Sequence, residues 1–370
     1  MVKYFLMIIM LIHGLIHIIG FVKEFKLAEV SQLSGKTLFP LTTLSAKAAG
    51  LFWLISCLLF AISAGMYLFE KDWWWIFALA GILISQVLII IYWQDAKFGT
   101  IANIIILFAA VLAYGNWIFY KSTNDELMKF YPPASSQTKF ISDGSISHLP
   151  AIVQKWLVQS NVVGKPIIQK VKLNQKGSLR TSPDGKWMDF FADQYFTTAK
   201  PGFIWIADVK AFPLIHLFGK DKYESGKGEM LIKLFGLIPV VNSKGDEISQ
   251  GALLRYLAEI IWIPSNAVMD YIQWEEIDSL SAKATMNYGN ISASGIFRYS
   301  QNGDFLSFTA KRFYERKEGA TLEDWYIETD TSSYKTFHGI RFASKSKVTW
   351  KLNSGDFNWL NLEITEIDYD

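Results

Sequence analysis

The chain has 370 residues and a formal net charge of +2; 51% of its residues are hydrophobic and 19% are charged. The hydrophobic share exceeds that of a typical soluble domain, whereas the charged share is too high for a protein that lies wholly within a membrane. A near-neutral charge without a basic stripe argues against a nucleic-acid partner. The single cysteine, Cys57, excludes an internal disulfide and a cysteine-based zinc site.

Four apolar runs occupy the first third of the chain. They cover residues 2–21, 48–69, 73–93 and 100–120. Each is close to the roughly 20 residues that a helix needs to span a bilayer. Trp73, Trp74 and Trp75 mark a membrane–water boundary, where a ring can be buried while its N–H stays wet. Residues 1–121 are therefore predicted to form four transmembrane helices of a multi-pass protein in the cell (inner) membrane, with the first run retained rather than cleaved as a signal peptide.

The lysines next to these runs bear on orientation. Four of them flank the side of the termini, at positions 3, 71, 121 and 129, and five flank the other side, at positions 23, 26, 36, 47 and 97. The positive-inside rule then places the termini, and the soluble domain that follows, outside the cytoplasm. The polar segment 22–47 is expected to contain a short helix at the membrane interface.

Two histidines in the first run are four residues apart, so His13 and His17 share one face of a helix. They could together reach a metal, a haem iron or a quinone, or they could hydrogen-bond between helices as neutral side chains. We favour the packing role, and we expect no bound cofactor. Gln86 and Asn103 are also expected to bond between helices.

Residues 122–147 are rich in Ser, Asn, Asp and Pro and are interpreted as a linker that includes Pro132-Pro133 and Ser135-Ser136. A short helix is predicted at 150–160, and a β pattern follows. Strand-like runs are found at 167–180, 187–197, 203–210, 229–241, 282–287, 291–299, 305–315, 322–328, 340–352 and 357–369. Asp184-Gly185 and Asn302-Gly303 are hairpin signals between such runs.

One helix interrupts the strands at 250–263 and stops at Pro264. Residues 148–370 are therefore predicted to be an α+β soluble domain, a long antiparallel β meander or half-barrel with a crossing helix. The run 230–241 is interpreted first as a buried strand and second as a lip that touches the membrane.

The soluble domain lacks the motifs that enzymes of the common classes carry, such as a nucleophile elbow, a zinc helix or a phosphate loop. Arg255 and Glu259 are one helical turn apart and are either an exposed ion pair or a clamp for a ligand head group. Gln194 and Arg312 alternate with apolar strand residues and are interpreted as rim or end positions. The candidate ligand-binding residues are Trp187, Phe190, Gln194, Tyr195, Trp205, Arg255, Tyr256, Glu259, Trp262 and Arg312. No catalytic residue is assigned.

Several segments resemble a bacterial family of unknown function, DUF6544. They are LIHGLIH at 11–17, WQDAKFGT at 93–100, SPDGKWM at 182–188, MLIKLFGLIPV at 230–240, RYLAE at 255–259 and LEITEI at 362–367. The resemblance implies a bacterial membrane protein without an assigned activity. The predicted meander also resembles, in architecture alone, the LolA and LolB half-barrels, which hold acyl chains against a concave sheet. A fainter likeness links the first run to DoxX-like membrane proteins.

The leading hypothesis from the sequence is a membrane-anchored, non-enzymatic module whose β-rich domain binds a lipid or another apolar ligand. One alternative is a membrane enzyme that acts on a lipid or quinone, with Arg255, Glu259, His13 and His17 as its polar groups. Another is an envelope protein that binds a further protein through an exposed apolar patch. The lipid bilayer is the expected partner, and no protein partner can be named.

Overall fold

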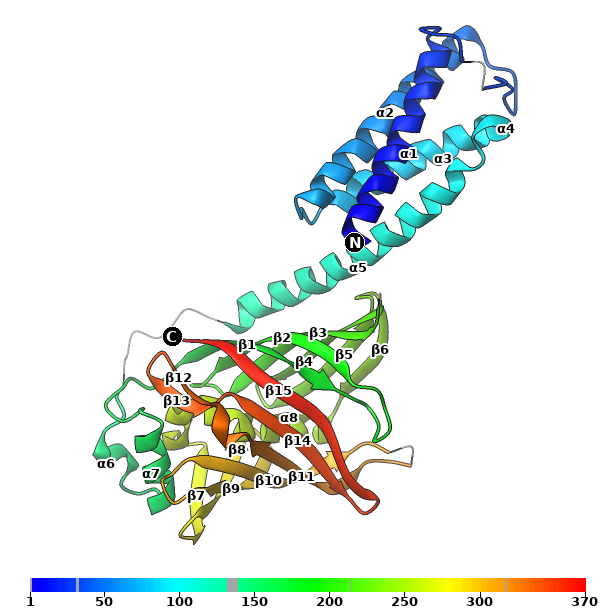
Figure 1. The fold of residues 1–370 in the computed structure, drawn as a ribbon. Coiled ribbons are helices and arrows are strands. Elements are labelled where there is room, and N and C mark those ends of the chain that lie inside the picture. The colour runs from blue at the N-terminus through cyan, green and yellow to red at the C-terminus, as the bar shows by residue number, and fades with distance from the viewer. Residues whose placement is uncertain (1, 31–32, 132–138, 214, 317) are drawn as a thin grey trace. The chain divides into compact units, whose positions relative to one another are not determined.

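The computed structural model describes residues 2–30, 33–131, 139–213, 215–316 and 318–370. The chain divides into two compact units, Met1–Tyr120 and Lys121–Asp370, which we call the helical unit and the β-rich unit. The helical unit contains α1 (Val2–Glu24), α2 (Thr43–Leu68), α3 (Trp74–Ile91), α4 (Trp93–Ala96) and the first part of α5 (Gly99–Phe130) (Figure 1).

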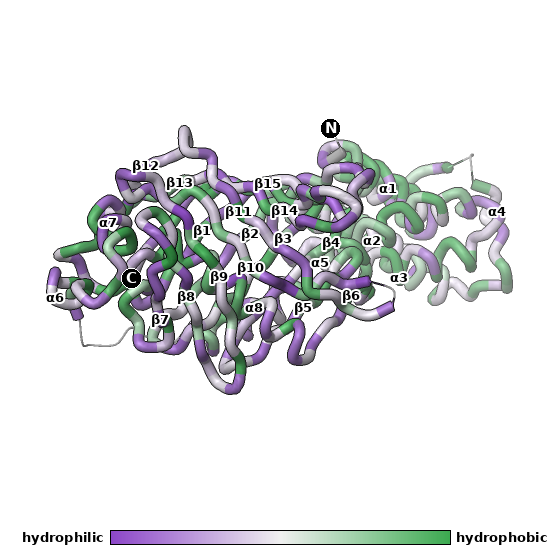
Figure 2. The backbone as a smooth tube through the Cα atoms, turned by 90° about the horizontal axis from the view of Figure 1, so that it is seen from below, coloured by the Kyte–Doolittle hydropathy of each residue, from purple (hydrophilic) through white to green (hydrophobic). Residues whose placement is uncertain are grey.

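Four of these helices, α1, α2, α3 and α5, are long and apolar enough to cross a membrane by length and composition. Met10 and Phe60 are buried at the centre of the bundle together with Ala78 and Ala110, so small residues allow the helices to pack closely. The opposite faces are also apolar, and Figure 2 shows hydrophobic residues around α1, α2 and α3. A helix that is apolar on all sides is typical of a membrane span.

The expected interfacial helix after the first span is not observed in residues 25–30 and 33–42. Instead α1 continues to Glu24 and the chain turns at Lys26, which has a φ of 56°. The backbone N–H groups of Ser34 and Gly35 donate to the carboxylate of Asp95, at 3.0 and 2.9 Å. The Asp95 side chain thus bonds two backbone N–H groups that, in a helix, would bond to backbone carbonyl groups.

Helix α5 runs to Phe130 and so extends into the segment expected to be a linker. Its last turns belong to the β-rich unit, where Glu126 forms ion pairs with Lys220 and Lys222 on one of the strands. The short helix α6 (Asp143–Ile146) also lies in the expected linker, and α7 (Ala151–Gln159) follows where a helix was predicted. Pro132-Pro133 and Ser135-Ser136 lie outside the described residues.

The β-rich unit is built on one antiparallel sheet of 13 strands, in the order β6-β5-β4-β3-β2-β1-β15-β14-β11-β10-β9-β8-β7. Its strands are β1 (Lys170–Leu179), β2 (Met188–Thr197), β3 (Gly202–Phe212), β4 (Ile215–Glu224), β5 (Lys227–Leu234), β6 (Ile238–Lys244), β7 (Ile272–Asp278), β8 (Ser281–Tyr288), β9 (Ile291–Tyr299), β10 (Phe305–Tyr314), β11 (Thr321–Thr329), β14 (Lys345–Leu352) and β15 (Gly355–Tyr369). A separate hairpin joins β12 (Tyr334–Phe337) and β13 (Ile340–Ala343).

The two halves of the sheet are joined at the first and last strands, where β1 pairs with β15. The chain passes between the two edge strands, β6 and β7, through α8 (Asp246–Glu259) and the 3-10 helices Ile260–Trp262 and Pro264–Val268. Helix α8 packs against β5 in one half of the sheet and against β9 in the other (Figure 1). The predicted half-barrel with a crossing helix is confirmed.

Three features of the strands differ from the pattern expected from the sequence. The run 340–352 is not one strand, because β13 belongs to the separate hairpin and β14 to the large sheet. The run 230–241 is not one strand, because Phe235 and Gly236 adopt φ values of 54° and 71° and turn the chain between β5 and β6. Strands β4 and β7 were not predicted. Both carry several charged residues, which obscure the alternation of apolar side chains.

The concave face of the sheet is densely packed. Alternate residues of β2 are buried on this face, namely Phe190, Ala192, Gln194 and Phe196. Leu253, Leu254 and Leu257 of α8 are fully buried in the same core as the sheet residues. Helix α8 therefore occupies part of the space that an open half-barrel would offer to a ligand.

Candidate functional site

A pocket of about 400 Å³ lies within the helical unit and is lined by residues of α1, α2, α3 and α5 and of the loops next to them. Its walls are largely apolar and include Ile9, Ile12, Ile16, Trp53 and Ile89. Ligand sites commonly have this size and an apolar lining with a few convergent polar groups.

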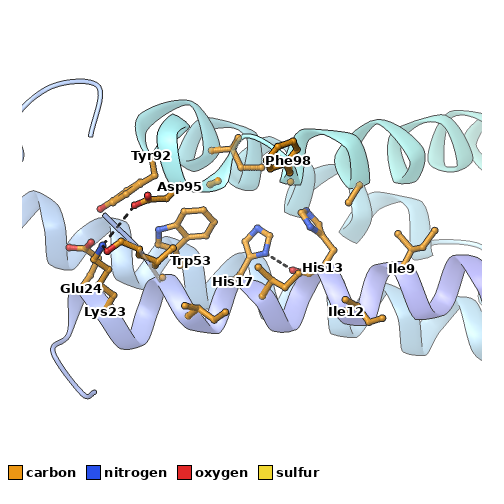
Figure 3. A pocket seen from close by; sticks show the side chains of 18 residues that line it. Ile9, Ile12, His13, His17, Lys23, Glu24, Trp53, Tyr92, Asp95 and Phe98 are labelled. Atoms are coloured by element: carbon orange, nitrogen blue, oxygen red, sulfur yellow. Dashed lines mark hydrogen bonds and ion pairs between the residues drawn. The ribbon is translucent and has the colours of Figure 1, made fainter. Parts of the chain in front are cut away.

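The charged groups of the pocket gather at one end. Figure 3 shows Lys23, Glu24 and Asp95 near Tyr92, at the end of α1 that is remote from Ile9. Lys23 Nζ lies 3.9 Å from Asp95 Oδ2 and donates to the carbonyl oxygen of Leu33 at 3.1 Å. Asp95 lies outside the apolar helices, and although burial acts to raise its pKa, the backbone donors and Lys23 together lower it. This end of the pocket therefore presents a lysine beside a carboxylate.

Both histidines of α1 line the pocket (Figure 3), and each is bonded to other buried side chains. His13 Nε2 lies 2.8 Å from Asn103 Oδ1, and His17 Nε2 lies 2.8 Å from Ser85 Oγ. His17 Nδ1 is 2.6 Å from the carbonyl oxygen of His13. Asn103 Nδ2 completes the network with 3.0 Å bonds to Ser85 Oγ and to Gln86 Oε1. The predicted interhelical bonds of Gln86 and Asn103 are thus present.

These bonds assign the tautomers of both histidines. A backbone carbonyl only accepts, so His17 Nδ1 carries the proton and His17 Nε2 accepts from the Ser85 hydroxyl. Asn103 donates through Nδ2, so its Oδ1 accepts from a protonated Nε2 of His13. His13 Nδ1 is then an unprotonated acceptor, and no described residue bonds to it. The network leaves one acceptor open on a pocket-lining residue.

The histidines do not form a metal site of ordinary composition. Within the described ranges, no group of three or more His, Cys, Asp or Glu side chains is placed to hold a metal ion. Three of the four ring nitrogens are already bonded within the protein. The arrangement is suited to hydrogen bonding with a ligand rather than to coordination.

A second polar cluster lies on the concave face of the β-rich unit, around the predicted pair on α8. Arg255 Nε bonds Glu259 Oε1 at 2.8 Å, and one terminal nitrogen of Arg255 bonds Asp221 Oδ2 of β4 at 2.7 Å. Gln194 Nε2 donates to Glu259 Oε2 at 2.7 Å and accepts from Gln175 at 3.1 Å. Arg255 and Glu259 therefore form an ion pair that is buried and not exposed.

The electrostatics of this cluster follow from its burial. Burial raises the pKa of Glu259 above its ordinary value, although Arg255 and Gln194 act in the opposite direction. Burial lowers the pKa of Arg255, but Glu259 and Asp221 outweigh that effect and raise it. The Arg255 guanidinium also lies 4.9 Å from the ring centre of Phe203. Both carboxylates of the cluster, Glu259 and Asp221, are thus bonded to Arg255 within the protein.

The structure thus brings together Gln194, Trp205, Arg255 and Glu259 of the predicted set, with the Trp205 indole donating to Gln175 at 2.7 Å. Gln194 is fully buried and is not a rim position. Phe190 packs edge-on against Trp205, with 5.9 Å between ring centres. Arg312, on β10, remains apart from these hydrogen bonds.

The other predicted residues lie elsewhere. Tyr256 and Trp262 are buried core residues, and the Tyr256 hydroxyl bonds the carbonyl oxygen of Thr197 at 2.9 Å. Tyr195 alternates with Gln194 and so faces the other side of the sheet, where it contacts Tyr131. Trp187 is 41% exposed and lies against Arg180.

Sequence reasoning missed Asp221, Gln175, Ser85 and the charged end of the pocket. Asp221 is on the unpredicted strand β4, so no alternation pointed to it. Ser85 is a polar residue within an apolar run. It could therefore have been recognised from the sequence as a candidate for hydrogen bonds between helices.

Comparison with known proteins gives one family match, to the family described as "Family of unknown function (DUF6544)", over residues 139–362. A structural neighbour is the crystal structure of a domain assigned to outer membrane lipoprotein sorting, from Vibrio parahaemolyticus. It is 8% identical, with a TM-score of 0.31, and the similarity covers 59% of this chain and 91% of that chain. At this TM-score the similarity carries no argument about this chain. No curated protein matches the chain.

Proposed function

The chain belongs to the DUF6544 family, whose function is unknown, and we propose that it is a membrane protein that binds an amphipathic, membrane-soluble molecule within its four-helix unit. The observation that carries the proposal is the pocket of about 400 Å³, which combines apolar walls with a charged end. An apolar ligand was expected on the concave sheet, but the core side chains of α8 fill part of that face. The proposal therefore moves the ligand into the helical unit.

The chemistry of the lining narrows the ligand class. The apolar walls favour a hydrocarbon body, and Lys23 and Asp95 favour a polar group at one end. His13 Nδ1 is an open acceptor further along α1, so the ligand carries a hydroxyl or a similar donor at that position. A neutral histidine that accepts such a bond is compatible with binding and requires no catalytic step.

We place the helices in the inner membrane with Asp370 outside the cytoplasm, because five of the nine flanking lysines lie on the side away from the termini. A reporter fused after Asp370 tests this orientation. An extracytoplasmic signal supports it, and a cytoplasmic signal contradicts it without affecting the pocket.

The binding proposal is tested by purifying the full chain in a mild detergent and identifying the co-purifying small molecules by mass spectrometry. The pocket-filling variant Ala102→Phe is compared with Ile105→Phe, which adds the same ring on an exposed position of α5. We expect a hydroxyl-bearing amphiphile in the wild type and in Ile105→Phe, with at least a tenfold lower amount in Ala102→Phe.

His13→Phe keeps an aromatic ring but removes the open acceptor, so it should also lower the bound amount. Size-exclusion elution as a single peak checks that each variant is folded. The same lipids at the same ratio in all four proteins would indicate bulk lipid alone and would refute the proposal.

A further inference from the structure

Arg312 of β10 is a half-buried cation for which no described residue supplies an acceptor. It follows Phe308 and Ala310 at alternate positions, and both are buried on the concave face. Its guanidinium lies 4.6 Å from the ring centre of Trp325 and 6.0 Å from that of Trp350. Stacking of this kind orients the guanidinium but leaves its edge donors unpaired.

Each nearby carboxylate is engaged by another cation. Glu323 is directly opposite Arg312 in the β10–β11 register, yet it pairs with Arg316 at 2.6 Å. Asp221 and Glu259, whose charges also act on Arg312, are both paired with Arg255. Within the described ranges, no hydrogen bond or ion pair therefore joins the guanidinium of Arg312 to a carboxylate.

The crossing helix leaves room for this side chain. At Gly251 of α8 an added Cβ would lie 3.2 Å from Arg312 Nε, so a larger residue there would press on the guanidinium. Burial lowers the pKa of Arg312 to about 10, which still leaves it charged at neutral pH. A charge that is partly withdrawn from water and unpaired is unfavourable, and an anion would compensate for it.

We propose that Arg312 binds the carboxylate or phosphate group of an anionic ligand on the concave side of the β-rich unit. The planar fork of an arginine matches either group with two parallel hydrogen bonds. Tyr314 is the next residue of β10 on the same face, and its ring packs 5.0 Å from that of Trp350. The aromatic surroundings suit a ligand with an apolar portion. This site is separate from the pocket of the helical unit and does not depend on it.

Isothermal titration of the full chain in a non-ionic detergent tests the proposal, with inorganic phosphate and sodium octanoate as separate probes. Arg312→Gln removes the charge, and Arg298→Gln is the matched control, because Arg298 is an exposed arginine on the neighbouring strand β9. We expect at least one probe to bind the wild type and Arg298→Gln equally, and to bind Arg312→Gln at least tenfold more weakly.

The two probes distinguish the sources of the anion. Binding of phosphate supports a phosphate-bearing ligand, and binding of octanoate alone supports a fatty carboxylate. Failure of both probes to bind, or equal binding by Arg312→Gln, would overturn the proposal. Ala102→Phe should bind the probe like the wild type. The test of Arg312 therefore stays valid even if no ligand binds the pocket of the helical unit.

Discussion

Replacement of Arg255 by glutamine should destabilise the β-rich unit far more than the same replacement of Arg312, although both arginines lie on the concave face. Arg255 holds two carboxylates, Glu259 at 2.8 Å and Asp221 at 2.7 Å. The side chains of these three residues are 15%, 9% and 11% exposed, so water cannot replace the lost partner. Arg312 has no carboxylate partner in the described part of the chain, so its removal leaves no charge behind.

The expected magnitudes follow from this difference. Removing one partner of a buried ion pair typically costs about 3–5 kcal/mol, because the other charge stays buried. For a unit of this size, about 2–4 °C of melting temperature are lost per kcal/mol, so Arg255→Gln should lower the transition of the β-rich unit by about 6–20 °C. Arg312→Gln loses its contact with Trp325 and should stay within about 1 kcal/mol of the wild type.

Thermal unfolding of the purified variants compares the melting temperatures of Arg255→Gln and Arg312→Gln. Hydrogen exchange of peptides from β4 and α8 shows whether the loss of stability lies in these elements. The peptide readout is needed because a protein with two units need not unfold in one step. Arg255 also lowers the pKa of Glu259, so its loss should let Glu259 take up a proton more easily. The deficit of Arg255→Gln should therefore shrink as the pH falls from 8 to 5. Equal melting temperatures for the two variants, or a deficit that grows in acid, would refute the reasoning.

Two further outcomes concern the same unit. Gly295→Ala places a Cβ 2.1 Å from Phe308 Cζ and should cost about 1–3 kcal/mol in denaturant unfolding, whereas Gly219→Ala, where the nearest atom lies at 3.6 Å, should cost less. Because burial raises the folded-state pKa of Glu259, its contribution to stability is present below the ordinary value of 4.5 and is lost as the pH rises through the raised value. Glu259→Gln should therefore show a flatter dependence of unfolding free energy on pH above 4.5, and a profile as steep as the wild type would contradict the assigned shift.

The large features of the fold could be predicted because they depend on local patterns. Four apolar runs of span length predicted the helices, and the alternation of apolar residues with turn signals predicted the antiparallel half-barrel. The pair Arg255 and Glu259 was recognised from its helical spacing alone. The family was recognised from short segments distributed along the chain.

The composition of the sites could not be predicted to the same extent, because it depends on contacts between distant segments. Asp221 reaches Arg255 only through the order of the strands, and β4 itself was not recognised among its alternating lysines. Gln194 was flagged by its apolar neighbours, but whether it lies at a rim or in the core depends on α8, which covers it. The depth of a polar residue is a property of what packs above it and not of its own strand.

The two proposed sites differ from the polar residues around them because each contains a polar group without a partner among the described residues. Buried polar groups in a folded protein are normally paired, so an unpaired one in an accessible place indicates a partner that comes from outside. In the helical unit the network of His13, His17, Ser85 and Asn103 satisfies itself except at His13 Nδ1. Near Arg312, Asp221 and Glu259 pair with Arg255 and Glu323 pairs with Arg316, whereas no described residue forms an ion pair with Arg312. One unit therefore offers an acceptor to a membrane-soluble molecule and the other offers a donor to an anion, and the two ligands should differ in chemistry.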